Sequence, residues 1–165
     1  MNDIAPLSLH EETVRPEWLD FNGHMNLAYY VLAFDHATDK FLHHIGLGEA
    51  YTRRVGRSIF VLETHVVYRQ EMHVHEPMRF TTQLLAYDAK RIQFIHHMYH
   101  AREGYLAAAN EIMALHVDLG TRRAAPIPDA VIDTLRRLLA VHDRLPRPPE
   151  AGRAVGLKQG AVTSG

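Results

Sequence analysis

The sequence contains no cysteine and only one tryptophan among its 165 residues. The absence of cysteine excludes disulfide bonds, thiol nucleophiles and thiolate metal ligands. No apolar run approaches the roughly 20 residues that a membrane-spanning helix requires, and no basic flank precedes an apolar run near the N-terminus. We therefore expect a soluble, cytoplasmic protein without a membrane partner.

The sequence also lacks an excess of charge of either sign, because it contains 18 basic and 19 acidic residues. This balance gives no broad basic surface for nucleic acid, so a phosphate-bearing ligand would have to be bound by a local group of residues. With 47% hydrophobic residues, the chain fits one globular domain. We place that domain at residues 1–145 and assign residues 146–165, rich in Pro, Gly and Arg, to an extended or mobile tail.

The apolar pattern predicts one long helix followed by antiparallel strands. From Leu27 to Gly46 the apolar residues recur at helical spacing, with Asn26 in the N-cap position. Residues 105–118 are ambiguous, because their Ala, Leu, Met and Glu favour a helix while the neighbouring strands need a partner. The fold class is therefore α+β, a long central helix wrapped by a curved antiparallel sheet. The predicted strands are 7–15, 57–71, 78–85, 91–101 and 105–118, and a short helix follows Pro128.

A polar loop between the first strand and the long helix carries the residue types needed for acyl transfer. The N–H groups of a first helical turn lack intrahelical acceptors and can bind an oxyanion, and Leu27 provides one of them. A carboxylate such as Asp20 can attack a carbonyl or take a proton from water. From spacing alone a structural interpretation is favoured, with Asp20 as a turn residue, Gly23 at positive φ and Asn26 as a cap.

The amino-acid sequence of this loop resembles that of a known family. The pattern D-x-x-G-H-M-N, followed by a Tyr-bearing helix, resembles the 4-hydroxybenzoyl-CoA thioesterase-like family, which has the hotdog fold. The likeness runs from about Thr13 to Leu139, with later segments in the same order. More narrowly, the sequence is similar to betainyl-CoA thioesterases and to the thioesterase domain fused to some carnitine dehydrogenases, through PEWLDFNGHMN, FDHATD, IGL, LETH, DAKR and LHVDL.

The resemblance implies an acyl-CoA thioesterase with its catalytic carboxylate at Asp20 and its carbonyl-polarising amide at Leu27. Gly23, His24 and Asn26 would complete the catalytic loop. His24 could orient Asp20, contact the ligand or hold the loop. The family's usual M-N-N is M-N-L in this chain, which retains an amide donor at Leu27 but no side-chain donor. Neither a cofactor nor a metal is expected, and the hotdog fold implies a homodimer or a dimer of dimers with sites shared between subunits.

The acyl group of betainyl-CoA carries a trimethylammonium, which needs aromatic or anionic surroundings. Trp18 is the favoured aromatic candidate, while Tyr30 is interpreted first as a core residue on the helix stripe. Glu63 either faces the cleft or pairs with a neighbouring basic residue. Lys90 and Arg91 resemble the basic turn that meets coenzyme A phosphates in related enzymes, and a solvated turn is equally consistent with them.

Other functions remain open at this point. A hotdog hydratase would need a paired acid and base, for which Asp20 and His24 are the obvious residues. A coenzyme A ester binding module without chemistry, or a thioesterase for other short or aromatic acyl groups, would also fit. The 13 histidines are interpreted as surface or strand-face residues rather than metal ligands.

Overall fold

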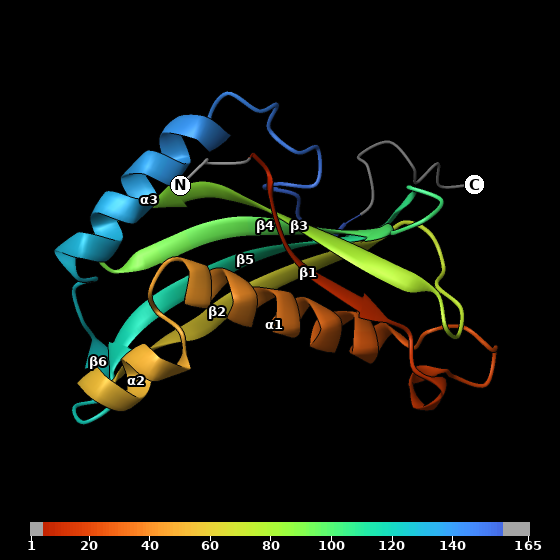
Figure 1. Ribbon diagram of the computed structural model, residues 1–165, viewed down its shortest axis with the longest axis horizontal. Coiled ribbons are helices and arrows are strands. Elements are labelled where there is room, and N and C mark those ends of the chain that lie inside the picture. Colours follow the sequence, from red (N-terminus) through yellow and green to blue (C-terminus); the bar gives the residue numbers. More distant parts are fainter. Residues whose placement is uncertain (1–4, 157–165) are drawn as a thin grey trace, which may run out of the picture.

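The computed structural model of the protein describes residues 5–156. It contains a strongly curved antiparallel sheet, one long helix inside the curve and a second helix against one end of the sheet (Figure 1). The elements, in chain order, are β1 (Leu7–Thr13), η1 (Pro16–Trp18), α1 (Leu27–His44), α2 (Glu49–Val55), β2 (Arg57–Tyr68), β3 (Pro77–Tyr87), β4 (Arg91–His100), β5 (Leu106–Asp118), β6 (Arg123–Ala124) and α3 (Asp129–His142).

The strand order is β1-β3-β4-β5-β2, with the two-residue β6 paired to the end of β5. Strands β3, β4 and β5 form a meander, and β2, which precedes them in the chain, pairs with the far side of β5. Among the described residues, β2 has β5 as its one strand neighbour. One long edge of β2 therefore offers its backbone groups to a further strand.

The apolar stripe of α1 faces the concave side of the sheet and forms the core. Phe34 and Phe41 are fully buried, and the ring of Phe41 packs 4.8 Å from that of Phe94 on β4. Burial of each such ring stabilises the fold by about 1.5–3 kcal/mol. The α3 residues Leu135 and Leu138 extend this core beyond the C-terminal end of α1. Helix α1 is thereby fixed along its whole length.

The predicted helix and its start are confirmed. Asn26 has extended backbone angles, and its side-chain oxygen accepts a hydrogen bond from Ala28 N–H at 3.0 Å. The strand interpretation of residues 105–118 is also confirmed, because β5 pairs with both β4 and β2 and its ladder bonds outweigh the helical propensity of its residues. Helix α2 and strand β6 were not predicted.

The described part of the predicted tail packs on the domain. Glu150 is only 3% exposed, and its carboxylate pairs with Arg69 at 2.6 Å and with His97 at 3.6 Å. Burial is the largest single effect and raises the pKa of Glu150, but the hydrogen bond and charge of Arg69, a backbone hydrogen bond and the charge of His97 together outweigh it, so the net shift is downward. Residues 146–156 are therefore anchored to the sheet by an ionised carboxylate, while the rest of the predicted tail, 157–165, lies outside the described residues.

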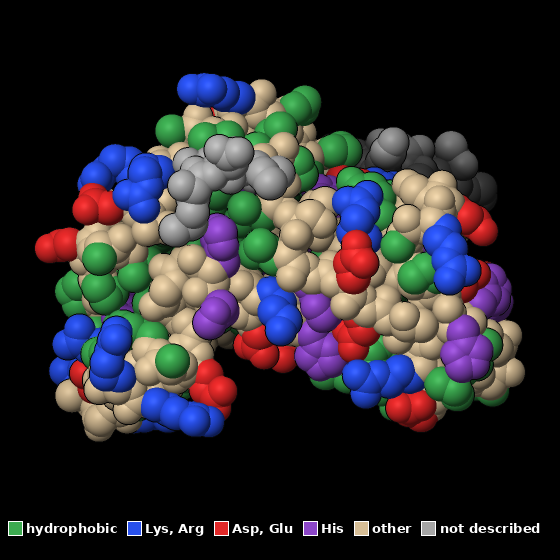
Figure 2. Space-filling view, viewed as in Figure 1, with side chains coloured by type: hydrophobic (Ala, Val, Ile, Leu, Met, Phe, Trp, Pro, Cys, Tyr) green, Lys and Arg blue, Asp and Glu red, His purple; other side chains and the backbone are tan. Residues whose placement is uncertain are grey.

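Figure 2 shows no patch of charge of a single sign on the face that it presents. Acidic, basic and histidine side chains are mixed across this face. Within residues 5–156, no helix is both long enough and apolar enough to cross a bilayer.

Candidate active site

The loop between β1 and α1 is held by its own backbone. Asp20 N–H donates to the carbonyl of His24 at 2.9 Å, and Gly23 N–H donates to the carbonyl of Asp20 at 3.0 Å. Gly23 has a φ of +81°, a conformation that side chains with a Cβ rarely adopt. The tight turn that results also aligns Leu19 with Met25 as a bridge. The loop is therefore a defined turn that presents the Asp20 side chain.

The position of Asp20 is consistent with both a structural role in the turn and a chemical role in the cavity. Its Oδ1 accepts the N–H of Asn22 at 2.8 Å, which closes a local turn and fixes the carboxylate. Among the described residues no partner lies against the second oxygen, Oδ2. The side chain lines a cavity of about 370 Å³, within the range of small-molecule sites. One oxygen thus orients the group while the other remains available for chemistry.

The N-terminus of α1 forms a second wall of the same cavity. Leu27 is the first helical residue, so its N–H has no intrahelical acceptor. The neighbouring N–H of Ala28 is already bound by Asn26, whereas no acceptor within the described residues lies against Leu27 N–H. The structure brings Asp20, Asn26 and Leu27 to one cavity, as the sequence predicted. A carboxylate and a free amide at a positive helix end suit attack on a carbonyl.

The remaining wall comes from the end of β2 and was missed in the sequence. Tyr68, Arg69, Gln70 and Glu71 line the cavity opposite the loop. The hydroxyl of Tyr68 donates to the carbonyl of Leu27 at 3.2 Å, which ties this strand end to the start of α1. Only the long-range placement of β2 beside α1 creates this wall. No local pattern in the sequence could have identified it.

His24 lies in the cavity but does not contact the Asp20 carboxylate. Its Nε2 lies 3.1 Å from a carboxylate oxygen of Glu71, and its ring meets the edge of His73 at a centroid distance of 5.1 Å. The backbone carbonyl of His24 accepts from Asp20 N–H. The His24 side chain therefore connects the loop to the segment after β2, which corresponds to the third role considered for it, that of holding the loop.

The aromatic residues are arranged differently from the expectation. Trp18 is 3% exposed and is not among the described residues that line the cavity, because Tyr29 stacks on its ring at 5.5 Å and the Arg15 guanidinium lies 5.0 Å from the ring centroid. Within one subunit Trp18 therefore does not line this cavity, and its role as the cation-binding aromatic stays a prediction. Tyr30 and Tyr68 line the cavity instead, edge to face at 5.2 Å.

Tyr30 also belongs to the core, as expected from the helix stripe. Its hydroxyl accepts the N–H of Met72 at 3.0 Å, and burial raises the pKa of Tyr30 to about 12. The phenol is therefore neutral at all physiological pH values. It contributes a ring face and a fixed dipole to the cavity rather than an acid or base.

Glu63 and the basic turn lie away from this cavity within one subunit. Glu63 is exposed on β2 and lines a separate pocket of about 260 Å³ with Glu111 and Gln93, and within residues 5–156 it has no ion-pair partner. Lys90 lies in the turn before β4 and Arg91 is the first residue of that strand, where it pairs with Asp88 at 2.6 Å. The sheet register places this turn beside the start of β2, at the opposite end from Tyr68.

A larger cavity of about 580 Å³ lies between the C-terminal half of α1, α2 and the start of β2. Its walls include Asp39, Lys40 and Glu49 and the N-cap Gly48 of the seven-residue α2, but none of the residues of the Asp20–Asn26 loop. Size alone does not identify a reaction centre, so the smaller cavity at Asp20 is the better candidate.

The sequence profile of the thioesterase-like superfamily matches residues 14–135. A betainyl-CoA thioesterase from Pseudomonas aeruginosa is 38% identical over 151 residues, which cover 92% of this chain and 95% of that protein. An L-carnitine dehydrogenase/betainyl-CoA thioesterase from Agrobacterium fabrum is 39% identical over 93% of this chain, and the match spans 32% of that longer protein.

Solved structures agree with the fold. A putative thioesterase from Pseudomonas putida superimposes with a TM-score of 0.81 at 32% identity, covering 94% of this chain and 99% of the other. A hypothetical protein from Staphylococcus aureus, solved in complex with CoA, gives a TM-score of 0.86 at 24% identity over 96% of this chain and 100% of the other. The second likeness concerns the fold alone.

Proposed function

Since this chain belongs to the thioesterase-like superfamily and hydrolyses acyl-CoA thioesters, we propose that Asp20 and the Leu27 amide form its reaction centre and that betainyl-CoA is its preferred substrate. One observation carries the assignment of the centre. Asp20 and Leu27, whose N–H has no acceptor among the described residues, line the same cavity.

The reaction needs one carboxylate and one oxyanion donor. Asp20 either takes a proton from water, which then adds to the thioester carbonyl, or adds to that carbonyl itself to form an anhydride that water cleaves. In both routes the carbonyl oxygen becomes an oxyanion beside Leu27 N–H. Collapse of the adduct breaks the C–S bond and releases the CoA thiolate, which leaves without strong acid assistance. The products are the free acid and CoA.

The cavity also supports a cationic acyl group. Tyr30 and Tyr68 present aromatic surface, and the carboxylate of Glu71 adds negative charge on the same wall. A quaternary ammonium is stabilised by aromatic faces and by nearby anions, by about 0.5–2 kcal/mol for each aromatic contact. This combination supports a trimethylammonium acyl group over a neutral aliphatic or aromatic one.

The proposed enzyme is a homodimer formed through the free edge of β2, and two such dimers can associate further. Exposed apolar side chains gather at this edge and at the nearby start of α1, namely Phe21 (97% exposed), Leu27 (66%), Val31, Val61 and Leu62. An open 12-residue edge strand beside exposed apolar groups favours pairing with a second copy.

Such pairing would also bring residues that lie far from the cavity within one subunit closer to the reaction centre of the partner subunit. Two β2 strands that pair antiparallel across a two-fold axis place the start of one beside the end of the other. The Lys90–Arg91 turn lies at the start end of β2, and Asp20 lies at the other end. In the dimer, Lys90 and Arg91 of one subunit would bind CoA phosphates at the Asp20 cavity of its partner, and Glu63 would lie at the interface. We place this chemistry in the cytoplasm, with the CoA ester pool.

The decisive experiment measures CoA release from betainyl-CoA, short aliphatic acyl-CoA and aromatic acyl-CoA by the wild type, Asp20→Asn and Asp35→Asn. Asp35 is an exposed aspartate on α1 and serves as the matched control. We expect a betainyl preference, loss of at least about 100-fold in kcat for Asp20→Asn, and no change for Asp35→Asn. Turnover of other esters instead would reject the substrate, and Asp20-independent turnover would reject the centre.

A single turnover in ¹⁸O-labelled water tests one form of the nucleophile route. Label in the Asp20 carboxylate requires an anhydride that water cleaved at the aspartyl carbon, and this outcome identifies the nucleophile. Label confined to the product acid leaves two routes, the general base and an anhydride that water cleaved at the acyl carbon. A protein that binds all the esters but releases no CoA would support the binding-module alternative.

A further inference from the structure

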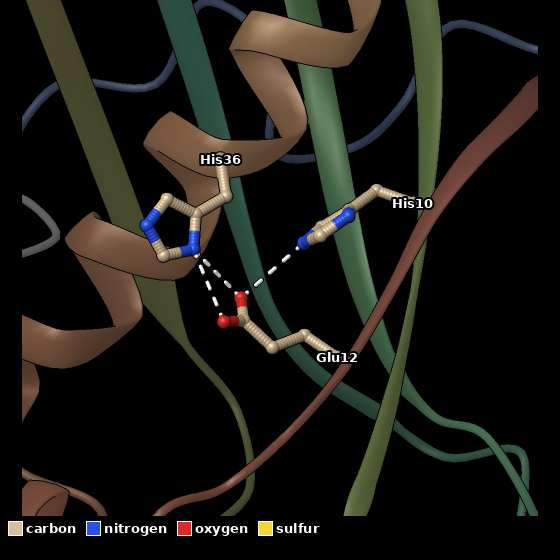
Figure 3. A group of neighbouring side chains, drawn as sticks. All are labelled: His10, Glu12 and His36. Carbon is tan, nitrogen blue, oxygen red and sulfur yellow. Dashed lines mark hydrogen bonds and ion pairs between the residues drawn. The ribbon is translucent and has the colours of Figure 1, made fainter.

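A second group of ligand-type side chains lies between β1 and α1, outside the cavity at Asp20. His10 and Glu12 are alternate residues of β1 and point to the same side of the strand, while His36 reaches them from the middle of α1 (Figure 3). Their nitrogen and oxygen ligand atoms all lie within 4.8 Å of one another. The sequence could not suggest this group, because 24 residues separate Glu12 from His36.

The spacing within the group fits a shared metal ion. His36 Nδ1 lies 2.9 Å from Glu12 Oε2, and His10 Nε2 lies 3.2 Å from the same oxygen. Ligands with bonds of about 2.0–2.1 Å to one ion stand roughly 3.0–3.4 Å apart, so small movements would admit the ion between them. Two imidazoles and one carboxylate form a donor set that suits zinc and its first-row neighbours.

The surroundings hold the ligands and leave an approach. The ring of His10 packs against Phe80 at 5.1 Å, which fixes its orientation. The side chain of Glu12 is 10% exposed, whereas that of His36 is 33% exposed and leaves a route for the ion and a water ligand. Arg15 Nη2 lies 3.2 Å from Glu12 Oε1 and opposes a cation, although its side chain is 54% exposed and its guanidinium also lies 5.0 Å from the Trp18 ring centroid.

From this geometry we propose that His10, Glu12 and His36 form a binding site for one Zn²⁺-class divalent cation. The three protein ligands leave a fourth position for water. The bound ion joins β1 to α1, the two elements between which the 14–26 loop runs. It would therefore fix the distance between the two ends of the loop that carries Asp20, without taking part in the cavity itself.

A binding measurement on the tag-free, chelator-treated protein tests the site with Zn²⁺ alone. Isothermal titration should give one strong site for the wild type and about 100-fold or greater loss of affinity for His36→Gln, for His10→Gln and for Glu12→Gln. His44→Gln removes an exposed histidine from the same helix and should bind as the wild type does. Mg²⁺ should not compete, since it favours oxygen ligands.

The other histidine–carboxylate group, at His24, Glu71 and His73, is more exposed and provides the competing explanation. His73→Gln should still bind Zn²⁺ at the strong site. Loss of strong Zn²⁺ binding in this variant would overturn the proposal. Equal Zn²⁺ affinity in the wild type and in His36→Gln would overturn it as well, because the three residues would then form only a hydrogen-bonded group.

A thermal measurement covers the case in which a variant folds poorly. Zn²⁺ at 100-fold excess over its dissociation constant should raise the wild-type melting temperature by about 5 °C or more, and should leave that of any folded ligand variant unchanged. Wild-type protein without a Zn²⁺-dependent shift would contradict the proposal. This readout does not depend on thioesterase activity, so it stands apart from the proposed function.

Discussion

Tyr68 on the edge strand donates its hydroxyl to the backbone carbonyl of Leu27, the first residue of α1, at 3.2 Å. This bond joins the edge where a second copy would pair to the helix end where the oxyanion would form. In the proposed dimer, the Tyr68 side chain would therefore connect the interface to the proposed reaction centre.

Tyr68→Phe should remove this link while retaining the aromatic ring. Because the bond is partly exposed, the free energy of unfolding should fall by only about 0.5–1 kcal/mol. The kcat should fall by about three- to tenfold, since even a small displacement of an oxyanion donor costs rate. Steady-state kinetics and urea unfolding measure both effects. Tyr87→Phe, on β3 and outside the cavity walls, is the control; an equal loss in both variants would reject a specific role for Tyr68.

Substitutions at Asn26 should separate the folding role of the cap from its role at the cavity. Asn26→Ala leaves Ala28 N–H without its acceptor and should destabilise the protein by about 1 kcal/mol. Asn26→Asp keeps an acceptor and should preserve stability, but its charge beside Leu27 N–H opposes an oxyanion and should lower kcat by about tenfold or more.

Asn26→Ser is the matched control, because a neutral hydroxyl can cap the helix without adding charge. We expect near wild-type stability and activity for it. Thermal unfolding and kcat are compared across the three variants. If Asn26→Asp is as active as Asn26→Ser, the helix N-terminus is not where negative charge develops.

The local elements of this protein could be predicted from the sequence, whereas only one of the two walls of the candidate site could be. The helix from Leu27, its Asn26 cap and the turn at Gly23 are set by residues close together in the chain, and all were predicted. The loop wall of the cavity, with Asp20, was predicted for the same reason.

The opposite wall depends on contacts between distant segments. Tyr68 and Glu71 reach the cavity only because β2 crosses to the far side of β5 and ends beside α1. Trp18 shows the same dependence on packing, since an aromatic residue next to this polar loop suggests a ligand contact, whereas within one subunit Tyr29 and Arg15 lie against its ring. Sequence patterns report which side chains are present, but which faces remain open is decided by tertiary packing.

Leu62 should govern assembly at the free edge of β2. It lies at a bulge in the strand and is 53% exposed. Leu62→Lys places a charge where the second copy would pack, so we expect a monomer by light scattering and a large loss of activity if the sites are shared. Val155→Lys alters an exposed valine elsewhere and should change neither. A fully active Leu62→Lys monomer would remove the need for a partner subunit.

Stability should depend on pH through His96, which lies fully buried between α1 and the sheet. Its two ring nitrogens face the hydroxyls of Thr38 at 3.0 Å and Thr82 at 2.8 Å. Burial lowers the pKa of His96 to about 3, with smaller contributions from the nearby His97 and His10. The imidazole is thus neutral in the folded protein and is protonated in the unfolded chain below its ordinary pKa of 6.5.

The sign of the effect follows from proton binding. Between pH 6.5 and about 3 the unfolded state binds one more proton at this residue than the folded state does, so stability falls as pH is lowered through that window. One such group contributes a slope of up to about 1.4 kcal/mol per pH unit. Urea unfolding at pH 7 and pH 5 should show this loss for the wild type and a smaller loss for His96→Gln, which cannot titrate. The control His44→Gln, at an exposed position, should retain the wild-type slope. An unchanged slope in His96→Gln would mean that other groups control the acid sensitivity. His97 is one such group, because burial also lowers its pKa.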